Sequence, residues 1–426
     1  MPDSIVPAQR EQPLPKTASF RDRLARRMVL ARLAHLEWGR LTLVEPDGEQ
    51  SFGRPDPSQP DVTLTVASPR FFSSIAFRGG LGAAEAYMDG AWSCDDLPGL
   101  IRMMVRNESV LQQVDRGWAR LAVPAARVLH WLRRNTRAGS RSNIAAHYDL
   151  GNDFYALFLD ETMTYSSGIF EHDDATLAEA SAAKYDRICR KLSLNPADRV
   201  VEIGCGWGGF ALHAAAHYGC HVTGVTISQE QLAFARRRVA EAGLADRVDL
   251  RMQDYRDVRG KFDKLVSIEM IEAVGHQYLG AFLRTCSDLL TPGGQMALQA
   301  ITIADQRYAR HIRTVDVIKR YIFPGGCLVS VTAVCGAATR ATDLRLVHME
   351  DITSSYARTL REWRARFLAA ADSVREMGFP ESFLRLWEYY LAYCEGAFTE
   401  RYVGDVQMIL AKPLCRLDVP LGTHGD

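Results

Sequence analysis

A glycine-rich turn at residues 204–209 constrains the fold of this chain more than any other feature. The apolar run Val200–Ile203 ends at Gly204, and a helical pattern then continues to His217. Gly204, Gly206 and Gly209 form the pattern G-x-G-x-x-G at a strand–turn–helix junction, the context in which this pattern indicates a ligand site. Glycines there let the backbone turn sharply and approach a ligand closely, although such turns also serve as tight packing corners.

Further strand patterns follow the turn and alternate with helical ones. The apolar strand segments are His221–Thr226, Val248–Met252, Phe262–Ile268 and Gln295–Ile301, and the first helical pattern between them covers Ser228–Ala242. This alternation predicts a Rossmann-like α/β fold, in which helices cover both faces of a mostly parallel sheet. The stretch Tyr356–Thr399 has helical spacing, and Val403–Leu410 is predicted to be a last edge strand.

The N-terminal part has a different pattern. A helix is predicted near residues 21–38, strands at Arg40–Val44 and Asp61–Val66, and helices around Gly82–Met88 and Leu97–Asn107. These elements predict a small α+β domain. We therefore expect a flexible tail at 1–20, a small N-terminal domain with a basic linker at 21–140, and an α/β domain at 141–426.

Charge and cysteine content exclude several classes of protein. Lys+Arg and Asp+Glu are both 51, which argues against a protein built to coat nucleic acid. No run of about 18 apolar residues is present, so no bilayer-spanning helix is expected. The nine cysteines are scattered, without C-x-x-C, which favours a reducing compartment and predicts neither disulfides nor a metal site. We expect a cytoplasmic protein.

Residues 116–148 combine seven arginines with interleaved apolar residues and contain no Asp or Glu. One interpretation is a solvated connector helix whose apolar face packs on the core. The other is a basic amphipathic surface that meets anionic lipid headgroups, which predicts peripheral contact with the inner face of the membrane.

Two ligands compete for the glycine turn. A dinucleotide enzyme holds the ribose through an acid about 20 residues beyond the turn, but Val225-Thr226-Ile227-Ser228 carries none. Glu202 instead precedes the turn and gives E-x-G-x-G-x-G. This pattern resembles the first motif of S-adenosylmethionine-dependent methyltransferases. The Gln253-Asp254 pair after the third strand resembles the place where such enzymes hold adenine.

Several motifs, found in order along the chain, narrow the resemblance to one family of these methyltransferases. The resemblance extends over nearly the whole chain. They are Tyr87–Trp92, Ala146–Phe154, Met163–Ser167, Gly204–Gly209, Val225–Ser228 and Tyr321–Leu328. Together they resemble the cyclopropane-fatty-acyl-phospholipid synthase family. The resemblance implies that residues 21–140 contact lipid and that residues 141–426 form the catalytic domain. It further implies S-adenosylmethionine as cofactor, a membrane phospholipid with a cis-unsaturated acyl chain as substrate, and a homodimer. It also implies that the alkene attacks the sulfonium methyl and that a bound bicarbonate ion removes a proton.

The resemblance carries site residues over by position. Glu272, Tyr356 and Ile301 match the family's bicarbonate-holding Glu, Tyr and Ile, whereas its Cys is Ser167 here and its His is Gln299. The cofactor contacts implied are Tyr165, Ser166, Glu202, Gly204, Gly206, Thr226, Gln231, Gln253, Asp254 and Ile268.

The departures bear on the reaction. Ser167 and Gln299 can still bind an anion, so a bicarbonate site is weakened rather than excluded. Glu269 stands where cyclopropane formers usually carry Gly or Ala. A second carboxylate beside Glu272 disfavours a bound anion, stabilises a carbocation, and leaves one acid able to serve as a base. The pattern resembles the branch that forms methylene or methyl-branched chains.

We therefore predict S-adenosylmethionine-dependent methylation of an unsaturated acyl phospholipid, with a methylene product favoured over a cyclopropane. The alternatives are a cyclopropane synthase, a non-catalytic lipid-binding protein, a nicotinamide-dependent oxidoreductase and a methyltransferase for a small soluble acceptor. The missing ribose acid argues against the oxidoreductase.

Overall fold

The computed structural model describes residues 17–108 and 150–416, which form two compact units. Unit 1 contains residues 17–108 together with Arg313–Pro324 and Trp363–Tyr402. Unit 2 contains residues 150–312, Gly325–Glu362 and residues 403–416. Unit 1 thus includes two segments that we assigned to the catalytic domain. The predicted basic segment at 116–148 and most of the predicted tail lie outside the described residues.

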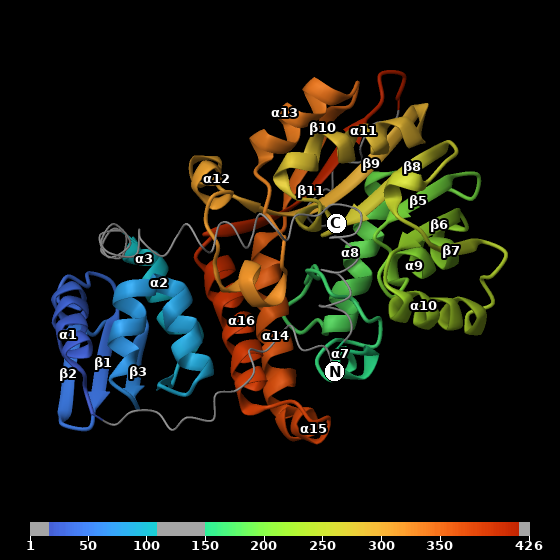
Figure 1. Ribbon diagram of the computed structural model, residues 1–426. Coiled ribbons are helices and arrows are strands. Elements are labelled where there is room, and N and C mark those ends of the chain that lie inside the picture. The colour runs from blue at the N-terminus through green and yellow to red at the C-terminus, as the bar shows by residue number, and fades with distance from the viewer. Residues whose placement is uncertain (1–16, 109–149, 417–426) are drawn as a thin grey trace. The chain divides into compact units, whose positions relative to one another are not determined.

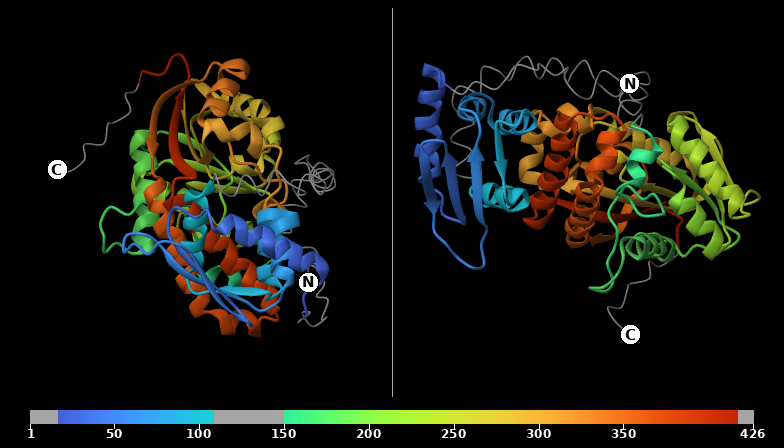
Figure 2. Two further views of the ribbon diagram at one scale, coloured as in Figure 1. Left: turned by 90° about the vertical axis from the view of Figure 1, so that its left-hand side faces the viewer. Right: turned by 90° about the horizontal axis from the view of Figure 1, so that it is seen from below.

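Unit 1 is a small α+β assembly (Figure 1). Its sheet has the order β2-β1-β3-β4, with β1 antiparallel to β2 and parallel to β3. Helix α16 packs against α2 and α3, which both views of Figure 2 show. The elements are α1 (Phe20–Leu33), β1 (Arg40–Glu45), β2 (Gly48–Gly53), β3 (Asp61–Val66), α2 (Arg70–Met88), β4 (Trp92–Cys94), α3 (Leu97–Arg106), η5 (Ile318–Ile322), α15 (Ala371–Glu376) and α16 (Glu381–Thr399).

Unit 2 carries a seven-stranded sheet of order β10-β11-β9-β8-β5-β6-β7. The strands from β9 to β7 pair in parallel, and β11 is antiparallel to both of its neighbours. Its strands are β5 (Arg199–Ile203), β6 (His221–Thr226), β7 (Val248–Met252), β8 (Phe262–Ile268), β9 (Leu290–Ile303), β10 (Arg345–Asp351) and β11 (Val403–Ala411). The helices are α7 (Asn152–Ala156), α8 (Leu177–Lys191), α9 (Gly209–Tyr218), α10 (Gln229–Glu241), η2 (Tyr255–Asp257), η3 (Ile271–Ala273), η4 (His276–Tyr278), α11 (Leu279–Leu289), α12 (Asp305–His311), α13 (Val331–Ala341) and α14 (Thr353–Ala369), whose last residues belong to unit 1.

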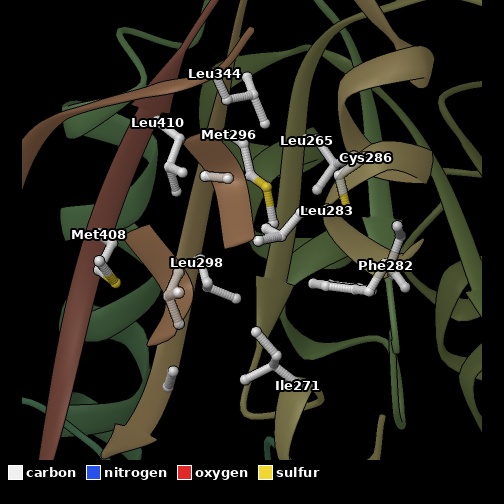
Figure 3. Packing of buried hydrophobic residues seen from close by; sticks show 14 of the residues in the cluster. Leu265, Ile271, Phe282, Leu283, Cys286, Met296, Leu298, Leu344, Met408 and Leu410 are labelled. Carbon is white, nitrogen blue, oxygen red and sulfur yellow. The ribbon is translucent and has the colours of Figure 1, made fainter. Parts of the chain in front are cut away.

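Consecutive strand residues face two different hydrophobic cores, because side chains alternate across a sheet. Val201, Leu265 and Met296 pack with helices α11 and α13, as Figure 3 shows for Leu265, Met296 and Phe282. The preceding or following residues, such as Val200 and Val266, pack with α8, α9 and α10. Helices therefore cover both faces, and the predicted mostly parallel α/β sheet is confirmed.

Two strand predictions differ from the structure. Val403–Leu410 does form a strand, but β11 lies between β9 and β10 and is not at the edge. Its residues from Asp405 onward are all buried, as an interior strand requires, whereas β10 is mostly exposed and forms the edge. Strand β9 covers Leu290–Ile303 and is therefore longer at both ends than the predicted segment Gln295–Ile301, and its first residues pair irregularly with β8.

Candidate active site

The predicted cofactor residues gather at one edge of the sheet in unit 2. Parallel strands end at a common edge, and ligands of open α/β sheets bind there. Glu202 and Gly204 lie at the end of β5, Thr226 at the end of β6, and Ile268 at the end of β8. Gln253 and Asp254 follow β7.

The glycine turn leaves space for a ligand. Gly204 has φ 85°, and a Cβ there would lie 2.7 Å from the Met270 Cγ. Gly206 has φ 50°, and apart from its two neighbours in the chain no heavy atom of the described residues lies within 4 Å of the position its Cβ would take. The two glycines therefore differ: Gly204 is required by the neighbouring side chain, whereas Gly206 keeps open the surface that a cofactor needs.

Glu202 is buried beneath this turn. Burial raises its pKa to about 8, and the nearby Lys184 opposes the shift. Within the described residues, its Oε2 has no hydrogen-bond partner. Lys184, also buried, donates to the Ser166 Oγ at 2.5 Å, and burial lowers its pKa to about 8. An orphaned carboxylate oxygen next to an open glycine turn fits a polar, cationic ligand such as S-adenosylmethionine.

The remaining predicted cofactor residues line the same edge. The Thr226 hydroxyl donates to the Gln231 Oε1 at 3.1 Å, so both side chains are held at the start of α10. Asp254 is buried, and its carboxylate accepts two hydrogen bonds from the Arg256 guanidinium, at 2.8 and 2.6 Å. Tyr165 packs against the Tyr155 ring with 5.4 Å between the ring centroids.

Glu269 is the centre of the second group of predicted residues. Its Oε1 accepts hydrogen bonds from the Ser167 backbone N–H at 2.9 Å and from the Gln299 Nε2 at 2.7 Å. Its Oε2 accepts from the Tyr356 hydroxyl at 2.6 Å. Glu269 has φ 47°, a left-handed conformation that L-residues other than Asn and Asp seldom adopt. Strain of this kind persists where function requires it.

Glu272 lies beside this group with one oxygen free. Its Oε1 accepts from the Ile301 backbone N–H at 2.5 Å. In the part of the chain that the structure describes, its Oε2 is buried without a hydrogen-bond partner. Burial and the nearby Glu269 carboxylate raise the pKa of Glu272 to about 8. The two carboxylates thus have different environments, the arrangement that separates a fixed charge from a proton acceptor.

Asp405 is a third buried carboxyl that the sequence analysis missed. Its Oδ2 accepts from the Gln299 Nε2 at 3.1 Å, so one amide nitrogen serves both Asp405 and Glu269. Burial and the charges of Glu269 and Glu272 raise the pKa of Asp405 well above its ordinary value. The one available signal was the pair of polar residues Asp405 and Gln407, spaced two apart in an otherwise apolar strand. Lys184 gave no such signal.

A bicarbonate ion does not fit this arrangement. The Gln299 and Tyr356 side chains and the Ser167 backbone N–H already bind the Glu269 carboxylate, and the Ile301 N–H binds Glu272. The Ser167 hydroxyl donates to the Gly168 carbonyl oxygen at 2.9 Å. An added anion would also face two carboxylates without a new donor. The side chain of Glu269 occupies the donors that such an ion would need.

Comparisons with known proteins show the family to which the chain belongs. The family described as Mycolic acid cyclopropane synthetase matches residues 135–408. Tuberculostearic acid methyltransferase UfaA1 of Mycobacterium tuberculosis is 38% identical over 414 residues, covering 95% of each chain. The cyclopropane-fatty-acyl-phospholipid synthase of Escherichia coli (strain K12) is 35% identical over 351 residues, covering 82% of this chain and 87% of that protein. The solved structure of mycolic acid cyclopropane synthase CmaA1 with SAH and CTAB has a TM-score of 0.60 and 31% identity, covering 64% of this chain and 98% of that one.

The sheet order, the glycine turn and these matches define a class I S-adenosylmethionine-dependent methyltransferase. More narrowly, the chain belongs to the cyclopropane synthase family. The nicotinamide-dependent oxidoreductase considered as an alternative is thereby excluded.

Proposed function

We propose that this enzyme methylates the cis double bond of an unsaturated acyl chain in a membrane phospholipid and forms an exocyclic methylene. The relatives named above act on fatty acyl or mycolic acid lipids, which supports the substrate class. One observation supports a methylene product over a cyclopropane. The Glu269 carboxylate accepts hydrogen bonds from three donors and lies in the place that a bicarbonate ion would need.

S-Adenosylmethionine would be held at the glycine turn and by Glu202, Thr226 and Asp254, and would supply an electrophilic methyl group. When the alkene π pair forms the new C–C bond, the S–CH3 bond breaks and its electron pair stays on sulfur, so S-adenosylhomocysteine leaves and the acyl chain carries a carbocation. Glu269, fixed by its three donors, presents a carboxylate that stabilises this cation. A hydride then moves from the methylated carbon to the adjacent cationic carbon, which places the positive charge on the methylated carbon.

Glu272 completes the reaction as the base. Its partner-free Oε2 can accept a proton, whereas both Glu269 oxygens already hold donors. A raised pKa makes the ionised Glu272 a stronger base, and the adjacent carbocation favours that ionised form. Loss of a proton from the transferred methyl group yields the methylene, while the same loss without the hydride shift closes a cyclopropane.

The test uses purified enzyme, vesicles of dioleoyl phosphatidylglycerol and labelled methyl donor. Ozonolysis followed by mass spectrometry separates the isomers, because ozone cleaves a methylene to a ketone and leaves a cyclopropane ring intact. We expect ketone fragments that carry the carbonyl at the position of the branch, with the labelled carbon released as formaldehyde. A product made only of cyclopropane would contradict the proposed product, and lipid binding without turnover would support the non-catalytic alternative.

Helix α1 supports the proposed contact with a membrane surface. Phe20, Leu24 and Met28 lie four residues apart on one helix face and are 73%, 46% and 38% exposed. Arg23 and Arg27 are exposed on the same helix. An apolar stripe flanked by arginines matches an anionic lipid surface. Among the described helices, none is both long and apolar enough to span a bilayer.

The proposed location is the cytoplasmic side of the membrane, because nine scattered cysteines without C-x-x-C favour a reducing compartment. The homodimer stays a prediction. Edge strand β10 exposes Leu346, Val347 and Met349, and exposed apolar edge strands favour pairing with a second chain. Light scattering would measure the mass in solution.

A further inference from the structure

We propose that Lys191 and Gln407 are positioning residues, which orient the Gln299 amide so that it donates hydrogen bonds to Glu269 and Asp405. This inference rests on the proposed role of Glu269 as the fixed anion of the site. It extends the functional machinery from the substrate-facing edge into the interior of unit 2.

A continuous row of hydrogen bonds connects these residues. The Lys191 Nζ donates to the Gln407 Oε1 at 2.7 Å, and the Gln407 Nε2 donates to the Gln299 Oε1 at 3.0 Å. The Gln299 Nε2 then donates to Glu269 at 2.7 Å. Lys191 also donates to the Glu350 carboxylate, which anchors the start of the row.

Strand register places the row within the sheet. Gln299 of β9 pairs with Gln407 of β11, and Gln407 pairs with Glu350 of β10. Directly paired residues point to the same face, so their side chains meet across the strands. Both glutamines and Lys191 are buried, so the hydrogen bonds form in a medium that strengthens them.

The direction of the row follows from chemistry. An ammonium group can only donate hydrogen bonds, so the Gln407 atom beside Lys191 must be its oxygen. Gln407 therefore directs its NH2 group toward Gln299, and the Gln299 side-chain oxygen must accept that hydrogen bond. The Gln299 NH2 is left facing the carboxyl groups of Glu269 and Asp405. A reversed Gln299 would place an oxygen lone pair against the Glu269 carboxylate and remove one of its three donors.

The groups that face Glu269 come from four other elements. They are Glu272 of η3, Asp405 of β11, Tyr356 of α14 and Lys184 of α8. Two of these are carboxyls that disfavour a further negative charge, so the donors from Gln299 and Tyr356 are needed to hold the Glu269 anion. The orientation of Gln299 therefore affects the protonation of the whole group.

The experiment compares full-length variants with the vesicle substrate across pH 6–9. Lys191→Met and Gln407→Glu each remove the constraint on the orientation of the Gln299 amide. Gln407→Glu does so because a carboxylate can only accept a hydrogen bond from Gln299. We expect kcat to fall roughly tenfold, as for residues that orient a functional group, and its acid limb to move to higher pH. The affinity for SAH, measured by calorimetry, should change less than about twofold, because the row does not reach the glycine turn. Lys191→Arg should retain the activity, since arginine also only donates.

Lys264→Met is the matched control. Lys264 is also buried and donates to a glutamine of β9, the Gln295 Oε1 at 2.7 Å, but this bond leads to no site residue. We expect its melting temperature to fall about as much as that of Lys191→Met, while its pH profile stays that of the wild type.

The outcomes separate this inference from the proposed function. Equal pH profiles for Gln407→Glu and the wild type, or the same profile change in Lys264→Met, would overturn the positioning role. If those variants behave normally while Glu269→Gln is inactive, the proposed function stands and only the row is structural. Full activity in Glu269→Gln would remove the proposed role of Glu269, on which this inference rests.

Discussion

At the scale of single residues, the features of Glu269 that serve the proposed function also lower the stability of the folded protein. Its backbone lies at φ 47° and its carboxylate lies among other buried acids, both of which disfavour folding. The three donors that converge on it offset part of this cost.

The first prediction concerns the backbone and the carboxylate of Glu269 separately. Glu269→Gly should be more stable than Glu269→Ala by about 1 kcal/mol, because glycine adopts positive φ without strain. Chemical denaturation of both variants measures this difference. Both should lose roughly 100-fold in turnover, as when a group that stabilises transition-state charge is removed. Added formate or bicarbonate should restore part of the Glu269→Gly activity, since the freed donors can then bind an anion. Absence of any rescue would argue against the donor set as an anion site.

The second prediction concerns the pH dependence of stability. The pKa of Glu272 is raised to about 8 in the folded protein, so between pH 5 and pH 8 the folded state holds a proton that the unfolded state has lost. The free energy of unfolding must therefore fall as pH rises through this window, by at most about 1.4 kcal/mol for each pH step of one. Glu272→Gln should flatten the decline in the melting temperature of the cofactor-free protein. Exposed Glu230→Gln is the control, and equal slopes in all three proteins would contradict the assignment.

At the scale of elements, sequence patterns predicted the strands that alternate with helices. They did not predict the place of β11 in the sheet, which depends on pairing between distant strands. Strands β6, β7 and β8 begin and end where the apolar runs do, because each run fits one buried strand. The position of β11 between β9 and β10 depends on long-range register, which no local pattern encodes. Asp405 and Gln407 were missed for the same reason, since their partners lie on β9 and α8. Glu269 and Glu272 were found through the family resemblance, and their place directly after a predicted strand agrees with it.

The third prediction distinguishes two glycines around the cofactor turn. Gly206→Ala fills open space and should weaken SAH binding by at least tenfold, about 1.4 kcal/mol, with a smaller loss of stability. Gly224→Ala instead places a Cβ 2.6 Å from the Leu250 Cδ2, so it should mainly lower the melting temperature. Calorimetry and thermal unfolding measure the two effects. Tight SAH binding by Gly206→Ala would show that the cofactor does not approach this turn.

At the scale of the whole molecule, the enzyme must reach a substrate that resides in a bilayer. The fourth prediction is that replacing Phe20, Leu24 and Met28 by Ser lowers binding to anionic vesicles and leaves the SAH affinity unchanged. Flotation with vesicles at low and high salt measures this, and salt should weaken wild-type binding by screening the arginines. The matched control replaces Leu346, Val347 and Met349 of β10 by Ser. If this control lost vesicle binding and the α1 variant kept it, α1 would not be the membrane contact.

The position of β11 also has a consequence for synthesis on the ribosome. Residues 403–411 emerge after every other strand of the seven-stranded sheet, yet they must enter between β9 and β10. Until they do, the nascent chain lacks Asp405 and Gln407, and Gln299 has no partner to orient it. We expect an emerging polypeptide to be unable to alkylate lipid, because translation delivers the last part of its reactive centre only with these residues.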